Sequence, residues 1–319
     1  MIVNVNDSSQ VADARRTATR IAQELRFDET AAGKAALIAT ELATNLVKHG
    51  GGGSILFVAN HALTIIAIDR GRGIPNVNAA MQDGYSTAGS PGTGLGAIKR
   101  AADLVDVYTF AGQGSAVLCR IGSTPATALR IGGVCVAKPG EDVAGDAWVS
   151  YMTRDTATIA LVDGLGHGPL AATAANVAVR TIGVNSDAPL ERILADMHNA
   201  MRPTRGAAVG IARIHTAHGR IDFAGVGNIA GGAVADDATR RVVSLPGIVG
   251  HEMRKVTTFS YPFNQSTVLV LHSDGISTSW NTTGYPGLMQ HDPALIAAVL
   301  YRDFGRNTDD ATVVVIKAA

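Results

Sequence analysis

The first part of the chain switches between helical and strand-like spacing of its apolar residues. Apolar side chains recur every three or four residues through 11–25, which predicts an amphipathic helix. A second helix of this kind begins at Asp28 or Thr30 and is stopped by the glycine run 50–53. Two helices are therefore expected before the first strand pair.

Short apolar runs bounded by turn residues follow the second helix and predict strands. Asn60-His61 and the glycines within 112–114 have the spacing of tight turns, and a helix fits 95–102 between the two strand pairs. The predicted strands are 55–59, 63–68, 106–110 and 116–121. This order indicates an α+β domain in which helices cover one face of a sheet.

The stretch 122–128 consists of small residues and a proline, which is typical of a linker. We therefore expect a first domain over 1–122, a linker over 123–130 and a second domain over 131–319. In the second domain, the pattern predicts strands at 133–137, 147–152, 158–162, 207–214, 219–225, 266–272 and 311–316, and helices at 170–182, 190–202 and 293–304. Many strands with few helices predict a layered β-sandwich flanked by helices.

The composition indicates what class of protein this is and in which cellular compartment we expect it. The 319 residues are enough for two cores, and 46% hydrophobic with 17% charged residues is typical of a folded chain. Lys+Arg and Asp+Glu both number 27, so no net charge favours nucleic acid or an anionic membrane as a partner. Cys119 and Cys135 lack a metal or redox spacing. With no signal peptide or membrane-spanning apolar run recognised, we expect a cytoplasmic protein.

A carboxylate and an amide share one face of the second predicted helix. Glu41 and Asn45 are four residues apart, in a helix that is otherwise apolar on that side. Such a pair can hold Mg²⁺ through the amide oxygen while the carboxylate takes a proton from an attacking hydroxyl. Taken alone, the pair is more typical of a solvated helix face.

Two glycine-rich motifs follow in a specific order. Asp69 ends a predicted strand and is followed by Gly71 and Gly73, so a carboxylate stands where the backbone can approach a flat ring closely. The sequence 92–96 then alternates glycine with other residues and leads into a helix, whose first N–H groups can bind phosphate. A glycine triplet alone is weak evidence, whereas the order of the three motifs is much more specific.

In this order the motifs resemble the GHKL ATPase family, and within it the small RsbT-like serine kinases of the anti-sigma type, over 1–121. The resemblance implies that Glu41 is the catalytic base, Asn45 the Mg²⁺ ligand and Asp69 the adenine contact, with a short lid over 81–91. It also implies that the glycines of both motifs bind ATP: Gly71, Gly73, Gly92, Gly94 and Gly96. Kinases of this kind phosphorylate STAS-domain proteins, which are therefore the implied partners.

The second half carries acidic residues at the ends of apolar runs. Asp146, Asp163 and Asp274 each adjoin such a run, and the pair Asp309-Asp310 precedes the last one. Carboxylates at strand ends can converge on one edge of a sheet, where they repel each other unless cations occupy the site. Two metal ions in such a site can activate a water against a phosphate ester. Unrelated turn aspartates would be the structural alternative.

This half resembles the SpoIIE/RsbX-like branch of the metal-dependent serine/threonine phosphatases, over 131–319. The resemblance implies a β-sandwich flanked by helices that binds Mn²⁺ or Mg²⁺, with Asp163 as the central catalytic ligand. The implied metal ligands are Asp146 through water, Asp163 as a bridge, the Gly164 carbonyl, Asp274 and Asp309. Asp310 is the less favoured member of its pair.

Some nearby residues depart from the family pattern or have open roles. Ala144 stands where family members often have a glycine, and its small side chain leaves the assignment intact. Arg205 is a speculative counterpart of the phosphate-binding arginine of eukaryotic relatives, although a surface role is favoured. For His167 a structural role at a helix entry is favoured, and for His215 and His218 exposure in a polar turn.

Together the motifs predict a regulator that combines a serine/threonine kinase with a metal-dependent phosphatase. The implied substrate is a STAS-domain anti-sigma antagonist or a stressosome-type protein in a partner-switching pathway. In the alternative hypothesis the phosphatase is active and the first domain only senses ATP or binds a partner, in the manner of an anti-sigma factor.

Overall fold

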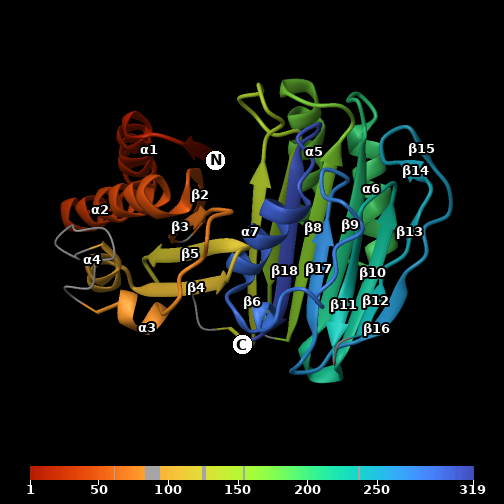
Figure 1. Cartoon of the computed structure of the whole chain (residues 1–319). Helices are drawn as coiled ribbons and strands as arrows, with labels where there is room; N and C mark the ends of the chain where they lie inside the picture. The colour runs from red at the N-terminus through yellow and green to blue at the C-terminus, as the bar shows by residue number, and fades with distance from the viewer. Residues whose placement is uncertain (61, 83–93, 124–126, 154, 236–237) are drawn as a thin grey trace. The chain divides into compact units, whose positions relative to one another are not determined.

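The computed structural model describes residues 1–60, 62–82, 94–123, 127–153, 155–235 and 238–319 (Figure 1). The chain forms two compact units. Unit 1 contains Met1–Ala126 together with Tyr285–Arg302, and unit 2 contains Thr127–Gly284 together with Asp303–Ala319. The structure thus differs from the predicted single domain over 131–319, because the segment 285–302 lies in unit 1.

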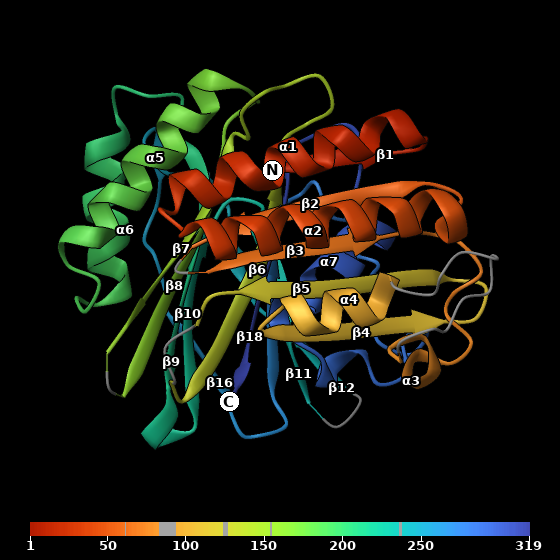
Figure 2. The same cartoon turned by 90° about the vertical axis from the view of Figure 1, so that its left-hand side faces the viewer.

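Unit 1 is an antiparallel sheet with helices on one face. The strand order is β1-β2-β3-β5-β4. The strands are β1 (Ile2–Val5), β2 (Gly53–Ala59), β3 (Leu63–Ile68), β4 (Leu104–Phe110) and β5 (Gly114–Ile121). Figure 2 shows the helices α1 (Val11–Glu24), α2 (Glu29–Asn45) and α4 (Gly94–Ala101) over the same face of this sheet. A short helix, α3 (Val77–Ala80), follows β3 and was not predicted.

Small buried residues fix the helices of unit 1 on the sheet. Ala14, Ala18 and Ile21 of α1 are buried at the spacing of one helix face. They share a core with Leu42 of α2 and Ile65 of β3. Because alanine side chains are small, the backbones of α1 and α2 can pack closely.

The helix α2 changes from an α-helix to a π-helix directly after the predicted site residue Asn45. A π-helical turn, Leu46–Gly50, continues α2 beyond Asn45. Gly51 follows with φ 71°, a left-handed conformation that glycine adopts without a side-chain penalty. The glycine run therefore ends the helix as predicted, but the last turn is a π turn, a rare form that is frequent at functional sites.

Polar contacts explain why the segment 285–302 belongs to unit 1. Asp292 accepts two hydrogen bonds from the guanidinium of Arg120 on β5, both of 3.1 Å. Asp106 of β4 accepts from the backbone N–H of Asp292 at 2.7 Å and lies 2.7 Å from Nδ1 of His291. Sequence patterns cannot reveal these pairs, because the partners are 172 to 186 residues apart.

Unit 2 contains two larger sheets and a small hairpin. One sheet has the order β13-β10-β9-β8-β7 with β16 beside β10, and the other has the order β12-β11-β17-β18-β6. The first sheet consists of β7 (Asp146–Met152), β8 (Thr156–Gly164), β9 (Ala207–His215), β10 (Arg220–Val226), β13 (Ser244–Leu245) and β16 (Phe259–Pro262). The second consists of β6 (Leu129–Val136), β11 (Ala230–Ala235), β12 (Ala238–Arg241), β17 (Val268–His272) and β18 (Ala311–Ala318).

Two cores hold unit 2 together. Residues of both sheets, such as Leu161 of β8 and Leu271 of β17, share one core between the sheets. The helices α5 (Pro169–Val184) and α6 (Leu190–Met201) form the other core with the outer face of β8 and β9. The predicted sandwich with helices is therefore present. The strands between 238 and 262 were not predicted because they are short, and β11 was not predicted because its alanines and glycines are weak strand formers.

The remaining elements are a hairpin and a helix. The hairpin pairs β14 (Gly247–Ile248) with β15 (Glu252–Met253). The helix α7 (Pro293–Phe304) has the predicted bounds and lies mostly in the segment of unit 1.

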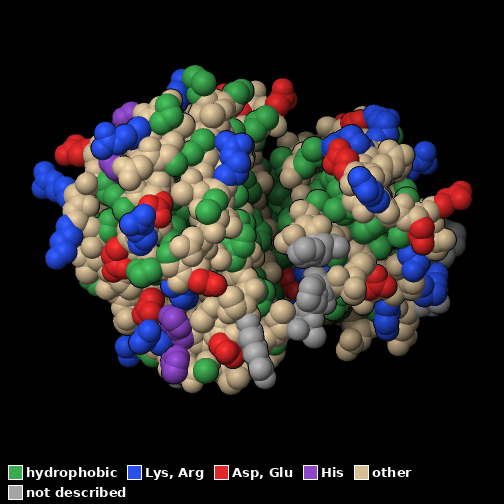
Figure 3. All heavy atoms as spheres, turned by 180° about the vertical axis from the view of Figure 1, so that it is seen from behind, with side chains coloured by type: hydrophobic (Ala, Val, Ile, Leu, Met, Phe, Trp, Pro, Cys, Tyr) green, Lys and Arg blue, Asp and Glu red, His purple; other side chains and the backbone are tan. Residues whose placement is uncertain are grey.

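Surface charge and hydropathy agree with the composition. On the face that Figure 3 presents, Lys and Arg side chains are interspersed with Asp and Glu. Within the described ranges, none of the helices combines the length and the apolar character needed to cross a bilayer.

We predict that Asp292→Ala destabilises the chain strongly. The variant removes the carboxylate from a pair in which Asp292 is 3% and Arg120 15% exposed, and breaking a buried pair costs about 3–5 kcal/mol. Urea denaturation followed by circular dichroism measures this. Asp13→Ala is the control, since the Asp13–Arg16 pair is exposed and such pairs contribute about 0–1 kcal/mol. Equal losses in the two variants would contradict the prediction.

Candidate functional sites

The helix motif and the second glycine motif of unit 1 meet in space. Glu41 and Asn45 are half-buried in the last turns of α2, and Gly94 begins α4. A Cβ atom on Gly94 would lie 3.3 Å from Oδ1 of Asn45 and 3.4 Å from Oε2 of Glu41. The start of α4 is therefore packed against both polar side chains, as a site shared by the two motifs requires.

Other parts of the second glycine motif are only partly described. Gly96 is buried in α4. Gly92 and the residues 83–91 of the predicted lid lie outside the described residues.

The first glycine motif surrounds a partly buried carboxylate. Asp69 directly follows β3, and its Oδ1 accepts hydrogen bonds from the backbone N–H of Gly71 (2.8 Å) and of Ser115 (3.2 Å). Burial raises the pKa of Asp69, while these two hydrogen bonds and the charge of Arg302 lower it. A Cβ on Gly71 would lie 2.8 Å from the carbonyl oxygen of Gly50, so the backbone there is closely packed.

The π turn connects the two parts of the candidate nucleotide site. Asn45 immediately precedes the turn, and a Cβ on Gly50 at its end would lie 2.9 Å from Cβ of Asp69. Five residues of helix advance about 7 Å along the axis. The π turn thus begins directly after Asn45 and packs its last residue, Gly50, against the side chain of Asp69.

Arg302 is a residue of this site that the sequence did not indicate. It is 7% exposed, and its Nη1 donates to the backbone carbonyls of Asp69 (3.0 Å) and Ser115 (3.4 Å). Both acceptors adjoin the hydrogen bonds that orient the Asp69 carboxylate. Arg302 therefore supports the backbone behind Asp69, and 233 residues separate the two in sequence.

In unit 2, two of the predicted metal ligands face each other across neighbouring strands. Asp146 begins β7 and is paired directly with Asp163 of β8. Side chains directly opposite in an antiparallel pair lie on the same face of the sheet. Burial raises the pKa of Asp146 to about 7 and that of Asp163 to about 8. For Asp163, neighbouring negative charges add to the effect of burial.

Those negative charges come from the other predicted acids. Asp146, Asp274, Asp309 and Asp310 all raise the pKa of Asp163. Asp274 follows β17 and Asp309 precedes β18, so the cluster draws on both sheets of unit 2. Burial and the charge of Asp309 also raise the pKa of Asp274. The structure therefore brings the predicted acids together.

The structure separates the roles of the two adjacent aspartates. Asp310 is 2% exposed and accepts hydrogen bonds from the backbone N–H of Lys138 (2.8 Å) and of Gly145 (2.9 Å), one on each oxygen. Asp309 is half-buried and accepts from the N–H of Asp310 through one oxygen. Asp310 thus fixes the loop before Asp146, and Asp309 is the member of the pair with an oxygen to offer a ligand.

Two further polar residues orient the acids. The Ser273 hydroxyl donates to Oδ2 of Asp146 at 2.7 Å and accepts from the N–H of Thr312 at 3.0 Å. Asn228 donates through Nδ2 to Oδ2 of Asp274 at 2.7 Å. Ser273 lies in the predicted acidic motif, which is a signal that could have found it, but nothing in the sequence points to Asn228.

The backbone of Gly164 is fixed between two neighbours. Its N–H donates to the carbonyl of Gly145 at 3.2 Å, and a Cβ there would lie 2.3 Å from the carbonyl oxygen of Ala171. No residue with a side chain fits without moving α5. The approach of α5 therefore explains the glycine at 164.

The histidines have other partners. Nδ1 of His167 lies 2.6 Å from Oε1 of Glu141, just before α5. Nε2 of His215 lies 3.0 Å from Oδ2 of Asp222, and the side chain of His215 is 18% exposed. The expectation of an exposed His215 was therefore wrong, because Asp222 holds the ring against the sheet.

The donor set fits hydrated divalent cations. In the described part of the chain, no three His, Cys, Asp or Glu side chains are grouped closely enough to hold one ion by themselves. A small divalent cation such as Mg²⁺ is commonly bound through one or two carboxylates and keeps several waters. The carboxylates raise each other's pKa, so ions placed between them would relieve their repulsion.

Comparison with known proteins agrees with the two halves of this description. Residues 153–319 match the family of stage II sporulation protein E (SpoIIE). Residues 5–121 match the histidine kinase-like ATPase domain family. The chain belongs to the SpoIIE family. Its first part is a histidine kinase-like ATPase domain.

Individual relatives resemble one half each. The serine/threonine-protein kinase RsbT of Bacillus subtilis (strain 168) is 33% identical over 120 residues, which are 36% of this chain and 90% of RsbT. The phosphoserine phosphatase RsbX of the same organism is 24% identical over 143 residues, 44% of this chain and 71% of RsbX. This SpoIIE-family chain therefore combines an RsbT-like part with an RsbX-like part.

A solved structure supports the fold. The PP2C phosphatase domain of SpoIIE from Bacillus subtilis, with a fragment of its regulatory domain, has a TM-score of 0.51 at 17% identity and covers 97% of this chain and 92% of that chain. The predicted fold, a GHKL-like α/β sandwich followed by a SpoIIE-type β-sandwich flanked by helices, is confirmed.

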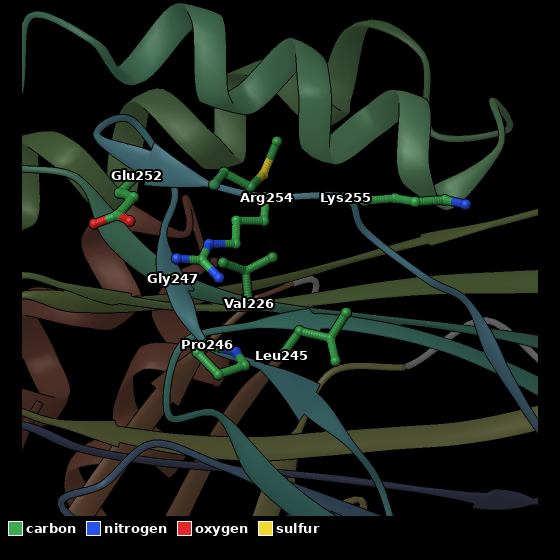
Figure 4. Close-up of a pocket in the computed structure, with 8 residues that line it drawn as sticks. Val226, Leu245, Pro246, Gly247, Glu252, Arg254 and Lys255 are labelled. Carbon is green, nitrogen blue, oxygen red and sulfur yellow. The ribbon is translucent and has the colours of Figure 1, made fainter.

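The SpoIIE part also contains a cavity of about 410 Å³ beside the hairpin β14–β15. Its lining residues are Val226, Leu245, Pro246, Gly247, Glu252, Met253, Arg254 and Lys255. Figure 4 shows the guanidinium of Arg254 reaching between Gly247 and Val226, while Lys255 extends away from them. None of the predicted site residues lines this cavity.

We predict that Asp310→Ala of this SpoIIE-family protein mainly lowers its stability, whereas Asp309→Ala mainly lowers its affinity for Mn²⁺. Asp310→Ala leaves two backbone N–H groups without their acceptor, and each unsatisfied buried group costs about 1–3 kcal/mol. Asp309→Ala is expected to cost less than about 1 kcal/mol in stability, typical of a partly exposed position, but to weaken Mn²⁺ binding. Urea denaturation and calorimetric titration with Mn²⁺ measure the two effects. A larger stability loss for Asp309→Ala would refute the assignment.

Proposed function

We propose that unit 2 is a Mn²⁺- or Mg²⁺-dependent phosphatase of phosphoserine and phosphothreonine. One observation carries this proposal: burial and four neighbouring acids raise the pKa of Asp163 to about 8. Cations beside such carboxylates favour their ionised forms. Bound there, divalent cations supply Lewis acidity and lower the pKa of a bound water, which is the chemistry that hydrolysis of a phosphate ester needs.

The residues of unit 2 then have distinct roles. We assign Asp163 as the bridging ligand, Asp146 as a ligand through water, and Asp274, Asp309 and the Gly164 carbonyl as direct ligands. The list of oxygen donors suits hard divalent cations. Ser273 and Asn228 would fix the carboxylates of Asp146 and Asp274 through the hydrogen bonds described above, as partners behind metal ligands commonly do.

We propose further that unit 1 binds ATP and transfers its terminal phosphoryl group to a serine or threonine. The packing of Gly94 against Glu41 and Asn45 supports this, since it joins a candidate base and a candidate Mg²⁺ ligand to the start of a helix. Oδ1 of Asp69 is engaged by two backbone N–H groups, so Oδ2 is the oxygen we assign to the adenine amino group.

The roles in unit 1 follow from these positions. Glu41 takes the proton of the attacking hydroxyl, Asn45 holds Mg²⁺ on the phosphates, and the backbone at Gly71 and Gly73 passes beside the adenine ring. Gly92, Gly94 and Gly96 are assigned to the phosphates. Transfer needs the attacking hydroxyl oxygen, the phosphorus and the leaving oxygen of ADP in line, with Glu41 within reach of the hydroxyl proton, which is a matter of positioning more than of covalent chemistry.

The two activities would act in opposite directions on one partner. The similarity to a kinase and to a phosphoserine phosphatase on the same chain supports this. We propose a STAS-domain anti-sigma antagonist or a stressosome-type protein as that partner, in a cytoplasmic partner-switching pathway. A chain of this kind sets the phosphorylated fraction of its partner by the balance of two rates.

In the alternative, unit 1 binds ATP or a partner protein without transferring phosphate. The same contacts of Asp69 would serve a nucleotide sensor, and an anti-sigma-like module would bind a protein instead. These hypotheses differ in whether Glu41 matters for chemistry.

We expect Asp163→Ala to lower Mn²⁺-dependent hydrolysis of a phosphoserine peptide by at least about 100-fold, because metal ligands of this kind organise the reaction. Release of inorganic phosphate measures this. Asp155→Ala is the matched control, since Asp155 is an exposed acid just before β8. Activity that survives in Asp163→Ala with Mn²⁺ present would show the site assignment to be wrong.

For the kinase, we expect Glu41→Ala to reduce phosphotransfer by about 10²–10⁴-fold, the usual contribution of a general base, while ATP still binds. The assay is mass spectrometry of a STAS-domain protein after incubation with ATP and Mg²⁺. Glu29→Ala is the control on the same helix, at its exposed first turn. If the wild-type chain binds ATP but transfers no phosphate, the sensor alternative replaces the kinase.

A further inference from the structure

The turn that carries Asp274 is closed by the carbonyl of the residue before it. The carbonyl oxygen of Ser273 accepts a hydrogen bond of 3.2 Å from the N–H of Ile276, which closes the turn 273–276. A second group reaches the same oxygen, because Nδ1 of His272 lies 2.9 Å from it. His272 is the last residue of β17 and is fully buried. A buried imidazole therefore lies directly behind the turn.

The other ring nitrogen of His272 is held by an indole. Nε1 of Trp280 donates to Nε2 of His272 at 3.0 Å, and Trp280 is 2% exposed. The two rings meet edge to face, and the guanidinium of Arg241 lies over the indole, 5.5 Å from its centroid. Only eight residues separate Trp280 from His272, so the chain returns to the imidazole soon after the turn.

These two partners allow only one form of the imidazole. An indole N–H can only donate, so Nε2 of His272 must present its lone pair. A carbonyl oxygen can only accept, so Nδ1 must carry the proton. The ring is therefore neutral, with one donor and one acceptor, and both are used. Trp280 thus determines which nitrogen donates to the carbonyl of Ser273.

The turn is fixed from its other side by the segment before β18. The carbonyl of Gly275 accepts a hydrogen bond of 2.7 Å from the N–H of Arg306. A Cβ on Gly275 would lie 1.9 Å from the carbonyl oxygen of Asp310, so the turn is packed against this backbone. The turn thus has backbone contacts on one side and the imidazole of His272 on the other.

Two of the carboxylates assigned to the metal site depend on this turn. Asp274 is part of it, and the hydroxyl of Ser273 donates to Oδ2 of Asp146 at 2.7 Å. Like charges in the cluster repel each other, so the turn must resist a force that pushes its carboxylate outward. A hydrogen bond that keeps the carbonyl of Ser273 in place stabilises the turn against that force. Groups behind metal ligands commonly orient them in this way.

We propose that His272 is a positioning residue that acts through Ser273 to hold the carboxylates of Asp146 and Asp274 for divalent cations. This inference rests on the metal site and the phosphatase function proposed for unit 2. His272 contacts neither cation nor substrate, and no proton leaves it. Its Nδ1–H keeps the turn in one conformation, and Trp280 keeps that proton on Nδ1.

The test separates the two hydrogen bonds of the imidazole. In His272→Asn the amide N–H can replace Nδ1–H, but the side chain does not reach Trp280. In His272→Gln the amide oxygen can replace Nε2, but the donor to Ser273 is lost. Calorimetric titration with Mn²⁺ should show about 10-fold weaker binding in His272→Gln, the lower end of the loss usual for partners of metal ligands. His272→Asn should stay within about 3-fold of the wild type.

His215→Gln is the matched control. Its imidazole is also hydrogen-bonded and partly buried, but the partner is the carboxylate of Asp222. His215 ends β9, whereas Ala208 near the start of that strand is the residue paired with Asp163. The strand between them spans about 23 Å, so this variant should leave Mn²⁺ binding as in the wild type.

A second measurement does not depend on the metal. The chain has two tryptophans, so in a Trp148→Phe background the indole N–H of Trp280 gives the one indole signal in a nitrogen-15 NMR spectrum. We expect slow hydrogen exchange of this N–H with His272 or His272→Gln present, and faster exchange in His272→Asn. If neither His272 variant folds, Trp280→Phe decides: it removes the donor, keeps an aromatic ring, and should weaken Mn²⁺ binding about 3-fold.

Two results overturn the inference. One is Mn²⁺ binding by His272→Gln within about 2-fold of the wild type. The other is a loss in His272→Asn as large as that in His272→Gln. In either case the imidazole contributes to folding alone, which urea denaturation of both variants would show as a loss of stability. For Trp280→Phe, unchanged Mn²⁺ affinity is the overturning result.

The proposed phosphatase fails in a different way. If the wild type binds Mn²⁺ more tightly than His272→Gln but hydrolyses no phosphoserine peptide, the phosphatase is overturned and the role of His272 stands. If the wild type hydrolyses the peptide and His272→Gln binds Mn²⁺ equally well, the phosphatase stands and the role of His272 is overturned. A wild-type chain that binds no Mn²⁺ overturns both.

Discussion

Repulsion between carboxylates that the fold holds together is the constraint on which unit 2 depends. Asp146 and Asp163 face each other because β7 and β8 are paired in that register, and Asp274 and Asp309 arrive from the second sheet. Burial, together with the charges of these neighbours, raises the pKa of Asp163 to about 8. The sandwich and its two cores stabilise this arrangement against its own electrostatic cost, and a protein pays such a cost at a functional site more readily than elsewhere.

In unit 1 the constraint is instead the placement of the backbone around the proposed nucleotide site. The π turn after Asn45, the hydrogen bonds to Oδ1 of Asp69 and the guanidinium of Arg302 behind it all fix main-chain positions. There the charge of Arg302 lowers the pKa of Asp69 against the effect of burial, whereas in unit 2 neighbouring acids raise the pKa of Asp163 further. The sites proposed for the two halves therefore rely on different means: an oriented backbone in one, and clustered charge in the other.

Much of the fold and of the candidate sites was predictable from the spacing of residues that lie close together in the sequence. The bounds of α7, the acids at strand ends and the order of the glycine motifs depend on residues close together in sequence, where periodicity and turn chemistry operate. The strands between 238 and 262 are too short to show a period, and the alanines and glycines of β11 give little strand signal. The roles of Asn228 and Arg302 depend on contacts between distant segments, which a single sequence does not encode in any local pattern. The choice between Asp309 and Asp310 needed their hydrogen bonds.

The membership of 285–302 in unit 1 has a consequence for how the protein is made. Asp106 and Arg120, on β4 and β5, can contact His291 and Asp292 only after most of the chain has been synthesised. Domains generally fold as units in the order of their synthesis. Here all strands of the first sheet precede residue 122, but unit 1 lacks the segment 285–302 until most of unit 2 has been synthesised, so unit 1 is completed late.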